Sequence, residues 1–327
     1  MRVIHNLSEL GETTSGSVVT IGNFDGVHLA HQELLRKVVE SAQASGAISA
    51  AITFHPHPSK ILAPERAPKL LTSLAQKTQL IEKLGIDLLV VLPFTRELSR
   101  LTPGEFGRDI LGGRLRPHSV YVGPNFRFGH RQSGDDRMLA DLGRQYGFNV
   151  KVLPMLEVRG ERVSSSRVRE FLAAGRVTAA GRILGRPFSS AGPIVPGLGV
   201  GKKQTVPTVN LAPIDEQLPG TGVYVTRTVL AGTPHESVTN VGYKPTFGEH
   251  QLTVESFLLN FTGEISETEM EVEYLYRLRD EMKFPDPATL KTQIQKDARC
   301  AMRFFRLLKL LRRHSSGHLA PSLPSRS

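Results

Sequence analysis

Two kinds of hydrophobic pattern divide the chain into halves. In the first half, short apolar runs alternate with segments whose apolar residues recur every three or four positions. Runs such as SVVTIG and DLLVVLPF are typical of strands that are buried on both faces of a parallel sheet. Segments such as LTSLAQKTQLIEKLG and SSSRVREFLAAG have helical spacing and end at glycine. This alternation predicts an α/β domain in which helices cover both faces of a parallel sheet.

The pattern changes near Gly185. Short β-rich runs separated by glycine and proline follow, such as GVYVTRTVL, SVTNVGY and MEVEYLYRLR, and they indicate a small all-β barrel. One long amphipathic helix comes next, and the chain ends in a segment rich in serine and proline. We therefore expect an α/β domain over residues 1–184, a β-barrel domain with a C-terminal helix over residues 185–312, and a disordered tail over residues 313–327.

The formal net charge of +10 is compatible with a nucleic-acid partner or with an enzyme that binds phosphorylated substrates. Much of the positive charge lies in RFFRLLKLLRRH near the C-terminus, and elsewhere basic and acidic residues are interspersed. The sequence has no helix-turn-helix, cysteine–histidine finger or aromatic RNA-binding signature. We therefore expect no nucleic-acid partner. We interpret the basic segment as the end of a helix that packs on the barrel through Phe304, Leu307, Leu308 and Leu311.

The expected cellular location depends on features that the sequence lacks. No apolar run reaches the roughly 18 residues of a transmembrane helix, and the first residues contain no apolar signal-peptide segment. The single cysteine, Cys300, excludes an internal disulfide and cannot alone form a cysteine-based zinc site. We expect a cytoplasmic protein without a membrane partner, a monomer or a weak homo-oligomer, in which Cys300 is a small buried hydrophobic residue.

The strand–turn–helix segment TIGNFDGVHLAHQELL carries the candidate chemistry of the first half. Gly22 and Gly26 allow backbone N–H groups to approach a ligand closely, and the N-terminus of the following helix favours phosphate. His28 and His31 can lie on one face of that helix and donate hydrogen bonds to a phosphoryl group. The stretch offers no obvious third ligand, which argues against a metal site. Asp25 is expected to shape the turn.

The same segment resembles a known motif. GNFDGVHLAH is similar to the GxFDxxHxGH signature of nucleotidylyltransferases, and within that superfamily it resembles the adenylyltransferase module of bacterial FAD synthetases. TFHPHP, VGPNFRFGHRQSG and VSSSRVREFL resemble that module's TFxPHP, VGxNFxFGxxxxG and ISSTxxRxxL segments, in the same order. The resemblance implies a Rossmann-like nucleotidylyltransferase domain that transfers AMP from ATP to FMN and releases FAD and pyrophosphate.

This resemblance also implies roles for individual residues. His28 and His31 would bind the ATP phosphates and stabilise the transition state, and His57 would contact the flavin. The other residues implied in ATP or phosphate binding are Gly22, Phe24, Asn125, Ser164, Ser165, Ser166 and Arg169. The serines also fit a helix N-cap, which needs no ligand. Two positions depart from the family pattern, since Ala30 replaces a glycine and His55 replaces an acidic residue.

The second half carries a loop rich in glycine and lysine, GLGVGKKQTVPTVNL, which does not match the GxxxxGK[ST] phosphate loop. Thr208 and Asn210 lie two residues apart, so an extended backbone places their oxygens on one face, where they suit Mg²⁺. The loop resembles the GxGxGRxLGxPTAN segment of the riboflavin kinase module. TNVGYKPTF, LTVESFLLNF and LRDEMKFPDPATLKTQIQKDA resemble later segments of that module.

This second resemblance implies that the barrel phosphorylates riboflavin to FMN with ATP. Glu255 would be the general base that accepts the proton of the riboflavin 5′-hydroxyl, and Arg279 and Phe284 would belong to the flavin-side loop. The ATP contacts would come from Gly199, Gly201, Lys202, Thr208 and Asn210, and the last two would also hold Mg²⁺.

We therefore expect a bifunctional enzyme that makes FMN from riboflavin and FAD from FMN, with ATP and Mg²⁺ in both steps. A second interpretation is an FMN adenylyltransferase whose barrel binds flavin but has a weak or inactive kinase site. It is motivated by Lys202, which replaces a loop arginine, and by Gln204 and Thr205, which replace leucine and glycine. Two further alternatives are a flavin-binding regulator or nucleic-acid-binding protein, and a transferase for another phosphorylated substrate. The retained motif residues and the attached barrel disfavour both.

Overall fold

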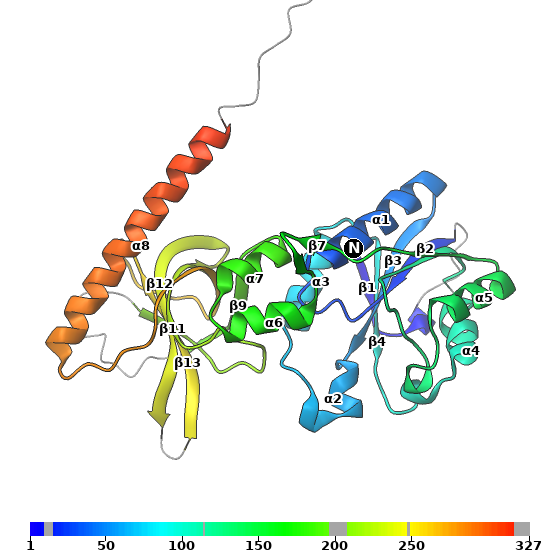
Figure 1. Ribbon diagram of the computed structural model, residues 1–327, viewed down its shortest axis with the longest axis horizontal. Coiled ribbons are helices and arrows are strands. Elements are labelled where there is room, and N and C mark those ends of the chain that lie inside the picture. Colours follow the sequence, from blue (N-terminus) through cyan, green and yellow to red (C-terminus); the bar gives the residue numbers. More distant parts are fainter. Residues whose placement is uncertain (10–15, 114, 196–207, 247–248, 317–327) are drawn as a thin grey trace, which may run out of the picture. The chain divides into compact units, whose positions relative to one another are not determined.

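A computed structural model of the chain describes residues 1–9, 16–113, 115–195, 208–246 and 249–316. The chain divides into two compact units (Figure 1). The first unit comprises Met1–Arg169, Arg182–Gly185 and Asp215–Gln217, and the second comprises Glu170–Gly181, Arg186–Ile214 and Leu218–Ser327. The predicted ATP-loop residues Gly199, Gly201 and Lys202 lie outside the described residues.

The first unit is built on a six-stranded parallel sheet of order β1-β4-β3-β2-β5-β6, which confirms the predicted α/β class. The strands are β1 (Arg2–Ile4), β2 (Ser17–Ile21), β3 (Ile48–His55), β4 (Leu88–Pro93), β5 (Pro117–Val122) and β6 (Asn149–Val152). The order reverses at β2, which lies between β3 and β5. In open parallel sheets, ligands bind beyond the carboxyl ends of the strands at such a reversal.

Helices connect these strands, as the sequence pattern predicts. They are α1 (Leu29–Ser45), α2 (Pro58–Leu62), α3 (Leu74–Glu82), α4 (Pro103–Phe106) with a following π-helical turn (Gly107–Leu111), and α5 (Asp136–Tyr146). Two further helices, α6 (Ser165–Ala173) and α7 (Val177–Leu184), come after β6 and contain residues of both units. A short hairpin of β7 (Glu157–Val158) and β8 (Glu161–Arg162) precedes α6. The ends of the helices are determined locally. Ser73 forms a capping box with Gln76 at the start of α3, and Gly46 ends α1 with a left-handed φ of 64°.

Alternate strand side chains separate into two cores, one on each face of the sheet. In β4, Val90 belongs to the core that includes Leu139 of α5, whereas Leu89 belongs to the core that includes Leu35 of α1 and Ile81 of α3. Both faces are therefore covered by helices. This explains why the strands read as continuous apolar runs rather than as alternating ones.

The second unit contains a closed barrel of six antiparallel strands in the order β10-β13-β12-β11-β14-β9, which confirms the predicted all-β class. The strands are β9 (Phe188–Val195), β10 (Thr208–Leu211), β11 (Gly222–Leu230), β12 (Thr233–Thr246), β13 (Glu249–Leu258) and β14 (Glu269–Arg279). The barrel encloses a row of buried hydroxyl groups joined by hydrogen bonds of 2.6 to 2.9 Å. These groups belong to Thr226, Thr228, Ser237, Thr239 and Ser256.

Helix α8 (Pro287–Ser316) packs on the outside of the barrel, where Ala301 and Phe305 contact a cluster that includes Val223 and Val225. The five expectations for side chains of α8 had mixed outcomes. Phe304 and Leu308 pack against this cluster as predicted. The prediction was wrong for Leu307 and Leu311, whose exposed fractions are 54% and 66%, and for Cys300, which is also exposed. At about 3.6 residues per turn, these three positions point away from the contact stripe.

The helix is also longer than expected. It continues to Ser316, so residues 313–316 are helical rather than part of a disordered tail. Proline and glycine are absent from the helix after Pro287, and the first glycine of the terminal segment is Gly317. Residues 317–327 lie outside the described residues. No helix in the described part of the chain combines the length and apolar character that crossing a membrane requires.

Candidate active sites

The glycine turn of the first unit directly follows the carboxyl end of β2. The Gly22 amide donates a hydrogen bond to the Ile52 carbonyl of β3 (3.0 Å), and the chain then turns through left-handed conformations at Phe24 (φ 47°), Gly26 (φ 78°) and Val27 (φ 39°). A methyl group on Gly26 would lie only 2.7 Å from Leu71. Gly26 is therefore required by both its backbone and its close packing.

Phe24 is buried within this turn. Its side chain is fully enclosed and meets the His31 ring edge-on, with ring centroids 5.3 Å apart. Only the backbone of Phe24 could therefore contact a nucleotide in this conformation. Ala30 lies in the first turn of α1, so its backbone is already helical, a conformation that favours alanine over glycine.

His28 and His31 stack on each other at the start of α1. Their ring centroids are 3.6 Å apart, with an interplanar angle of 15°. His28 is the N-cap residue, and its Nδ1 accepts a hydrogen bond from the His31 amide (3.4 Å), which places the ring proton of His28 on Nε2. The predicted pair therefore shares one face, as its spacing required.

The electrostatic environment keeps His31 uncharged. Burial, the neighbouring His28 and the Lys77 ammonium lower the pKa of His31 well below its ordinary value of 6.5. Its Nδ1 is buried and has no hydrogen-bond partner among the described residues. A neutral imidazole in this position carries one N–H donor, which can serve a phosphoryl oxygen.

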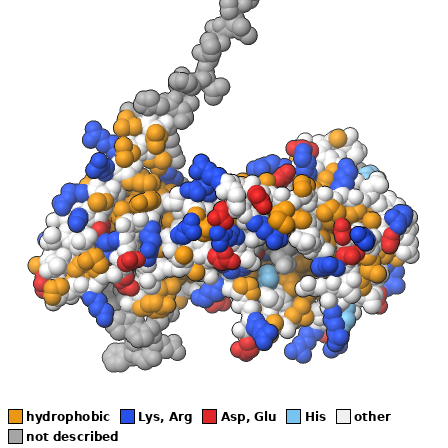
Figure 2. Space-filling view, in the orientation of Figure 1, with side chains coloured by type: hydrophobic (Ala, Val, Ile, Leu, Met, Phe, Trp, Pro, Cys, Tyr) orange, Lys and Arg blue, Asp and Glu red, His pale blue; other side chains and the backbone are white. Residues whose placement is uncertain are grey.

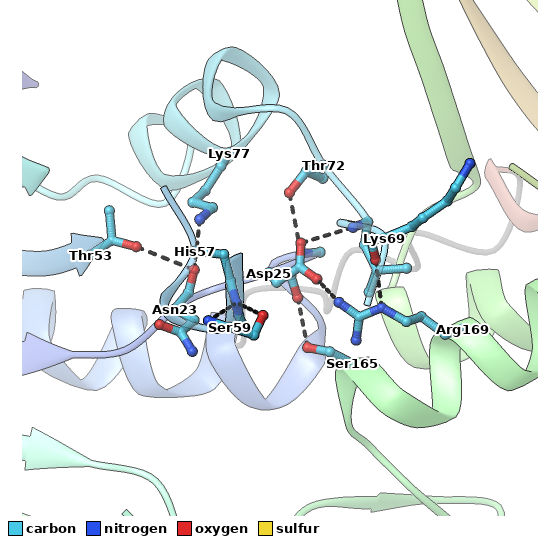
Figure 3. A network of polar contacts seen from close by, with 12 residues as sticks. Asn23, Asp25, Thr53, His57, Ser59, Lys69, Thr72, Lys77, Ser165 and Arg169 are labelled. Atoms are coloured by element: carbon cyan, nitrogen blue, oxygen red, sulfur yellow. Dashed lines mark hydrogen bonds and ion pairs between the residues drawn. The ribbon is translucent and has the colours of Figure 1, made fainter. Parts of the chain in front are cut away.

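Asp25 connects the turn to two other segments (Figure 3). One carboxylate oxygen accepts a hydrogen bond from the Leu71 amide (2.9 Å), and the other forms an ion pair with Arg169 of α6. Arg169 also donates to the Lys69 carbonyl (2.7 Å), and Ser165 donates to the Asp25 carbonyl (2.9 Å). These contacts support the prediction that Asp25 shapes the turn. They also show that Arg169 helps to hold it.

Two further groups surround the turn (Figure 3). Lys77 of α3 donates to the Asn23 carbonyl (2.7 Å), and the same carbonyl accepts from Thr53 of β3 (3.2 Å). His57 caps α2, where its Nδ1 accepts from the Ser59 amide (3.2 Å), and burial is the main cause that lowers the pKa of His57. Sequence reasoning missed Lys77, because one lysine in a helical pattern carries no signal of burial.

The remaining predicted residues of the first unit have different environments. Asn125 follows β5, is exposed and has a left-handed φ of 60°. Because β2 and β5 are parallel neighbours, Asn125 lies at the same sheet edge as the glycine turn. Ser164 accepts from the Arg167 amide (3.2 Å), as a helix cap does, whereas Ser166 is exposed.

In the second unit, the strand register places Thr208, Asn210 and Glu255 on one face of the barrel. Asn210 of β10 pairs with Glu255 of β13, and Glu255 pairs on its other side with Asn240 of β12. Directly opposite residues in antiparallel strands have adjacent side chains. Thr208 lies two residues from Asn210 and therefore shares its face. Sequence reasoning missed Asn240, because only the strand pairing brings it beside Glu255.

Two residues that are predicted to lie on the flavin side of the kinase site, Arg279 and Phe284, are close together. The Arg279 guanidinium is 5.9 Å from the centre of the Phe284 ring. It also binds Asp297 of α8, with Nη2–Oδ2 and Nε–Oδ2 distances of 2.7 and 3.1 Å. Gln293 donates a further hydrogen bond to Asp297 (2.8 Å). Asp297, like Lys77 and Asn240, is a residue that the sequence did not single out.

These arrangements define a class of protein. A glycine turn with a histidine pair at the reversal point of a parallel sheet is a site for phosphate groups, and the barrel face offers a carboxylate beside polar oxygen donors. The chain is a two-unit transferase for phosphorylated substrates. The FAD synthetase family model matches residues 10–167, and the riboflavin kinase family model matches residues 184–305.

Curated relatives identify the family. The bifunctional riboflavin kinase/FMN adenylyltransferase of Pseudomonas fluorescens is 35% identical over 302 residues, which cover 92% of this chain and 97% of that protein. Its counterpart from Escherichia coli (strain K12) is 34% identical over 311 residues, which cover 94% and 98%. The chain belongs to the family of bifunctional riboflavin kinases/FMN adenylyltransferases. It has both activities, and the interpretation as an adenylyltransferase alone is not favoured, since both family models match.

A solved structure agrees in fold. A crystal structure described as a macrolide-efflux protein from Streptococcus pneumoniae is similar to this chain with a TM-score of 0.82 and 27% identity. The similarity covers 92% of this chain and 98% of that one.

Proposed function

We propose that each unit carries one of the two activities. FMN adenylylation would take place at the glycine turn of residues 22–31, and riboflavin phosphorylation on the barrel face that carries Thr208, Asn210 and Glu255. The observation that carries the proposal is the pairing of polar groups at each place: stacked histidines beside a helix N-terminus, and a carboxylate next to an amide in the strand register. We place the boundary between residues 184 and 185, and the riboflavin kinase match, which begins at residue 184, supports it.

Adenylyl transfer requires positioning and charge neutralisation. An FMN phosphate oxygen would attack the α-phosphorus of ATP, a new phosphorus–oxygen bond would form, and the bond to the β-phosphate oxygen would break to release pyrophosphate. FMN phosphate needs no strong base. His28, His31 and the N-terminal amides of α1 would stabilise the developing charge, and Asn125 would contact phosphate. Arg169 would contribute mainly by holding Asp25 and the turn.

Phosphorylation of riboflavin requires a base and a bound nucleotide. Glu255 would accept the proton of the riboflavin 5′-hydroxyl while the hydroxyl oxygen attacks the γ-phosphorus of ATP, and the bond from that phosphorus to the β-phosphate oxygen would break to release ADP. Thr208 and Asn210 would bind ATP, and Arg279 and Phe284 would line the flavin side. His57 would have the corresponding flavin contact in the first unit.

The donor set of the barrel face fits Mg²⁺. Its hydroxyl, amide and carboxylate oxygens are hard ligands, and Mg²⁺ commonly shares its site with water and substrate phosphates. No group of three or more histidine, cysteine or acidic residues in the described part of the chain could form a cage of protein ligands. Thr208 and Asn210 would hold the ion together with ATP. When bound, Mg²⁺ would neutralise phosphate charge and orient the leaving group.

We expect a cytoplasmic enzyme, because both reactions consume ATP, and a monomer or weak homo-oligomer without a nucleic-acid partner. On the face drawn in Figure 2, basic and acidic side chains are interspersed except along α8 at the upper left, where basic side chains predominate. The mixed charge elsewhere supports small-molecule substrates rather than a polyanion.

Two variants in the full chain test the division of labour. Glu255→Gln should lower FMN formation from riboflavin by about 10² to 10⁴-fold and leave FAD formation from FMN unchanged. His31→Ala should lower FAD formation from FMN by about 10² to 10³-fold and leave the kinase unchanged. Matched controls are Glu269→Gln, at an exposed position of β14, and His118→Ala, at an exposed position near the amino end of β5. Loss of both activities in either variant, or of neither, would contradict the assignment.

A further inference from the structure

Lys77 is a buried cation at the glycine turn. Only 4% of its surface is exposed, and its ammonium donates to the Asn23 carbonyl at 2.7 Å. That carbonyl is neutral, as is Thr53, which donates to the same oxygen. An ammonium removed from water without a charged partner raises the free energy of the folded state. This cost suggests that the buried charge of Lys77 has a function beyond stabilising the fold.

The other cation beside the turn, unlike Lys77, has a charged partner. Arg169 is ion-paired with Asp25, so the two charges cancel. Among the described residues, no carboxylate lies within ion-pairing distance of Lys77, although Asp25 acts on it at longer range. When the charges of Asp25, Arg169 and Lys77 are added, the turn therefore carries one net positive charge.

The charge of Lys77 affects the pKa values of two histidines at the site. After burial, which is the largest cause, Lys77 is one of the groups that lower the pKa values of His31 and His57. Figure 3 shows Lys77 on the α3 side of the turn, with Asn23 and His57 below it. Asn23 lies directly after Gly22 and before the left-handed Phe24, so the carbonyl that Lys77 holds belongs to the first residues of the turn after β2.

We propose that Lys77 is a positioning residue for FMN adenylylation, whose buried ammonium fixes the Asn23 carbonyl and attracts the polyphosphate of ATP to the turn. The inference rests on the proposed assignment of adenylyl transfer to this turn. In this role Lys77 acts through the Asn23 carbonyl and through its charge, without contacting the substrate. ATP supplies the anionic charge that is missing around Lys77 in the free protein.

The test is Lys77→Met in the full chain, which keeps the apolar stem and removes the charge. The control is Lys83→Met, the same change at the exposed C-cap of the same helix. The KM for ATP and kcat are measured for FMN adenylylation and for riboflavin phosphorylation. We expect the adenylylation KM for ATP to rise at least about tenfold in Lys77→Met, with kinase constants unchanged and Lys83→Met equal to the unaltered protein.

Two results would overturn the inference. One is an adenylylation KM for ATP that stays within twofold of the control. The other is a lower kcat at unchanged KM that matches the fraction of first-unit protein unfolded at the assay temperature, since this would show a purely structural role. His31→Ala, measured in parallel, separates the two hypotheses. If His31→Ala is inactive in adenylylation while Lys77→Met is normal, only the role of Lys77 fails. If His31→Ala is fully active, the assignment of the site fails.

Discussion

The ion pair between Asp25 and Arg169 allows a quantitative prediction. The side chains are only 3% and 17% exposed, so water hardly screens either charge. Asp25→Asn preserves the shape of the side chain but leaves the Arg169 guanidinium buried and unpaired. Breaking one partner of a buried pair typically costs about 3–5 kcal/mol of unfolding free energy. The hydrogen bond from the Leu71 amide is retained, because asparagine keeps one carbonyl oxygen that can accept it.

The assay must report on the first unit separately, because two units need not unfold together. Amide hydrogen exchange followed by mass spectrometry gives the opening free energy for peptides of β2 and of β11. We expect Asp25→Asn to lower the value for β2 by about 3–5 kcal/mol and to leave β11 unchanged. FAD formation from FMN should fall by about 10²-fold, because the turn that positions the histidines is displaced.

A surface pair and a double variant complete the design. Asp141 pairs with Arg144, and these side chains are 65% and 76% exposed. Asp141→Asn should therefore change the stability by at most about 1 kcal/mol. Adding Arg169→Met to Asp25→Asn should restore part of the lost stability, since it removes the unpaired charge. A loss below about 1 kcal/mol in Asp25→Asn, equal to the surface control, would refute the reasoning.

Three further predictions follow from single side chains. Because burial, His28 and Lys77 lower the pKa of His31, the unfolded state binds more protons than the folded state just below pH 6.5. The first unit should therefore lose up to about 1.4 kcal/mol per pH unit through His31 as the pH falls from about 6.5 towards its folded-state pKa. His31→Asn should reduce the slope in hydrogen exchange, and the lowered pKa of His57 should account for part of what remains. Ala30→Gly should destabilise the first unit by about 0.5–1 kcal/mol without lowering the KM for ATP, because Ala30 is already helical; a clearly lower KM would show that its methyl group crowds the nucleotide. Arg279→Lys should lose the two-contact bond to Asp297 and destabilise exchange-protected peptides of α8 by about 1.5–3 kcal/mol, whereas unchanged protection would show that the bond contributes little.

The sequence by itself determined the elements and the motifs. Apolar runs, helical spacing and the glycine stops are local, because each depends on residues within one or two turns of chain. The parallel sheet followed by a barrel could therefore be predicted, as could the shared face of His28 and His31. The resemblance to two enzyme modules came from the same local segments, which is why the family could be recognised before the fold was known.

Only the tertiary structure decided which side chains meet across long stretches of chain. Lys77 reaches Asn23 over 54 residues, and Arg169 reaches Asp25 over 144. Strand register, rather than spacing, placed Asn240 beside Glu255. The exposure of Leu307, Leu311 and Cys300 likewise depended on which stripe of α8 the barrel covers. The physical reason is common to all of these: burial and partner choice depend on where distant segments pack, and hydrophobic periodicity specifies a face of an element without specifying what lies against it.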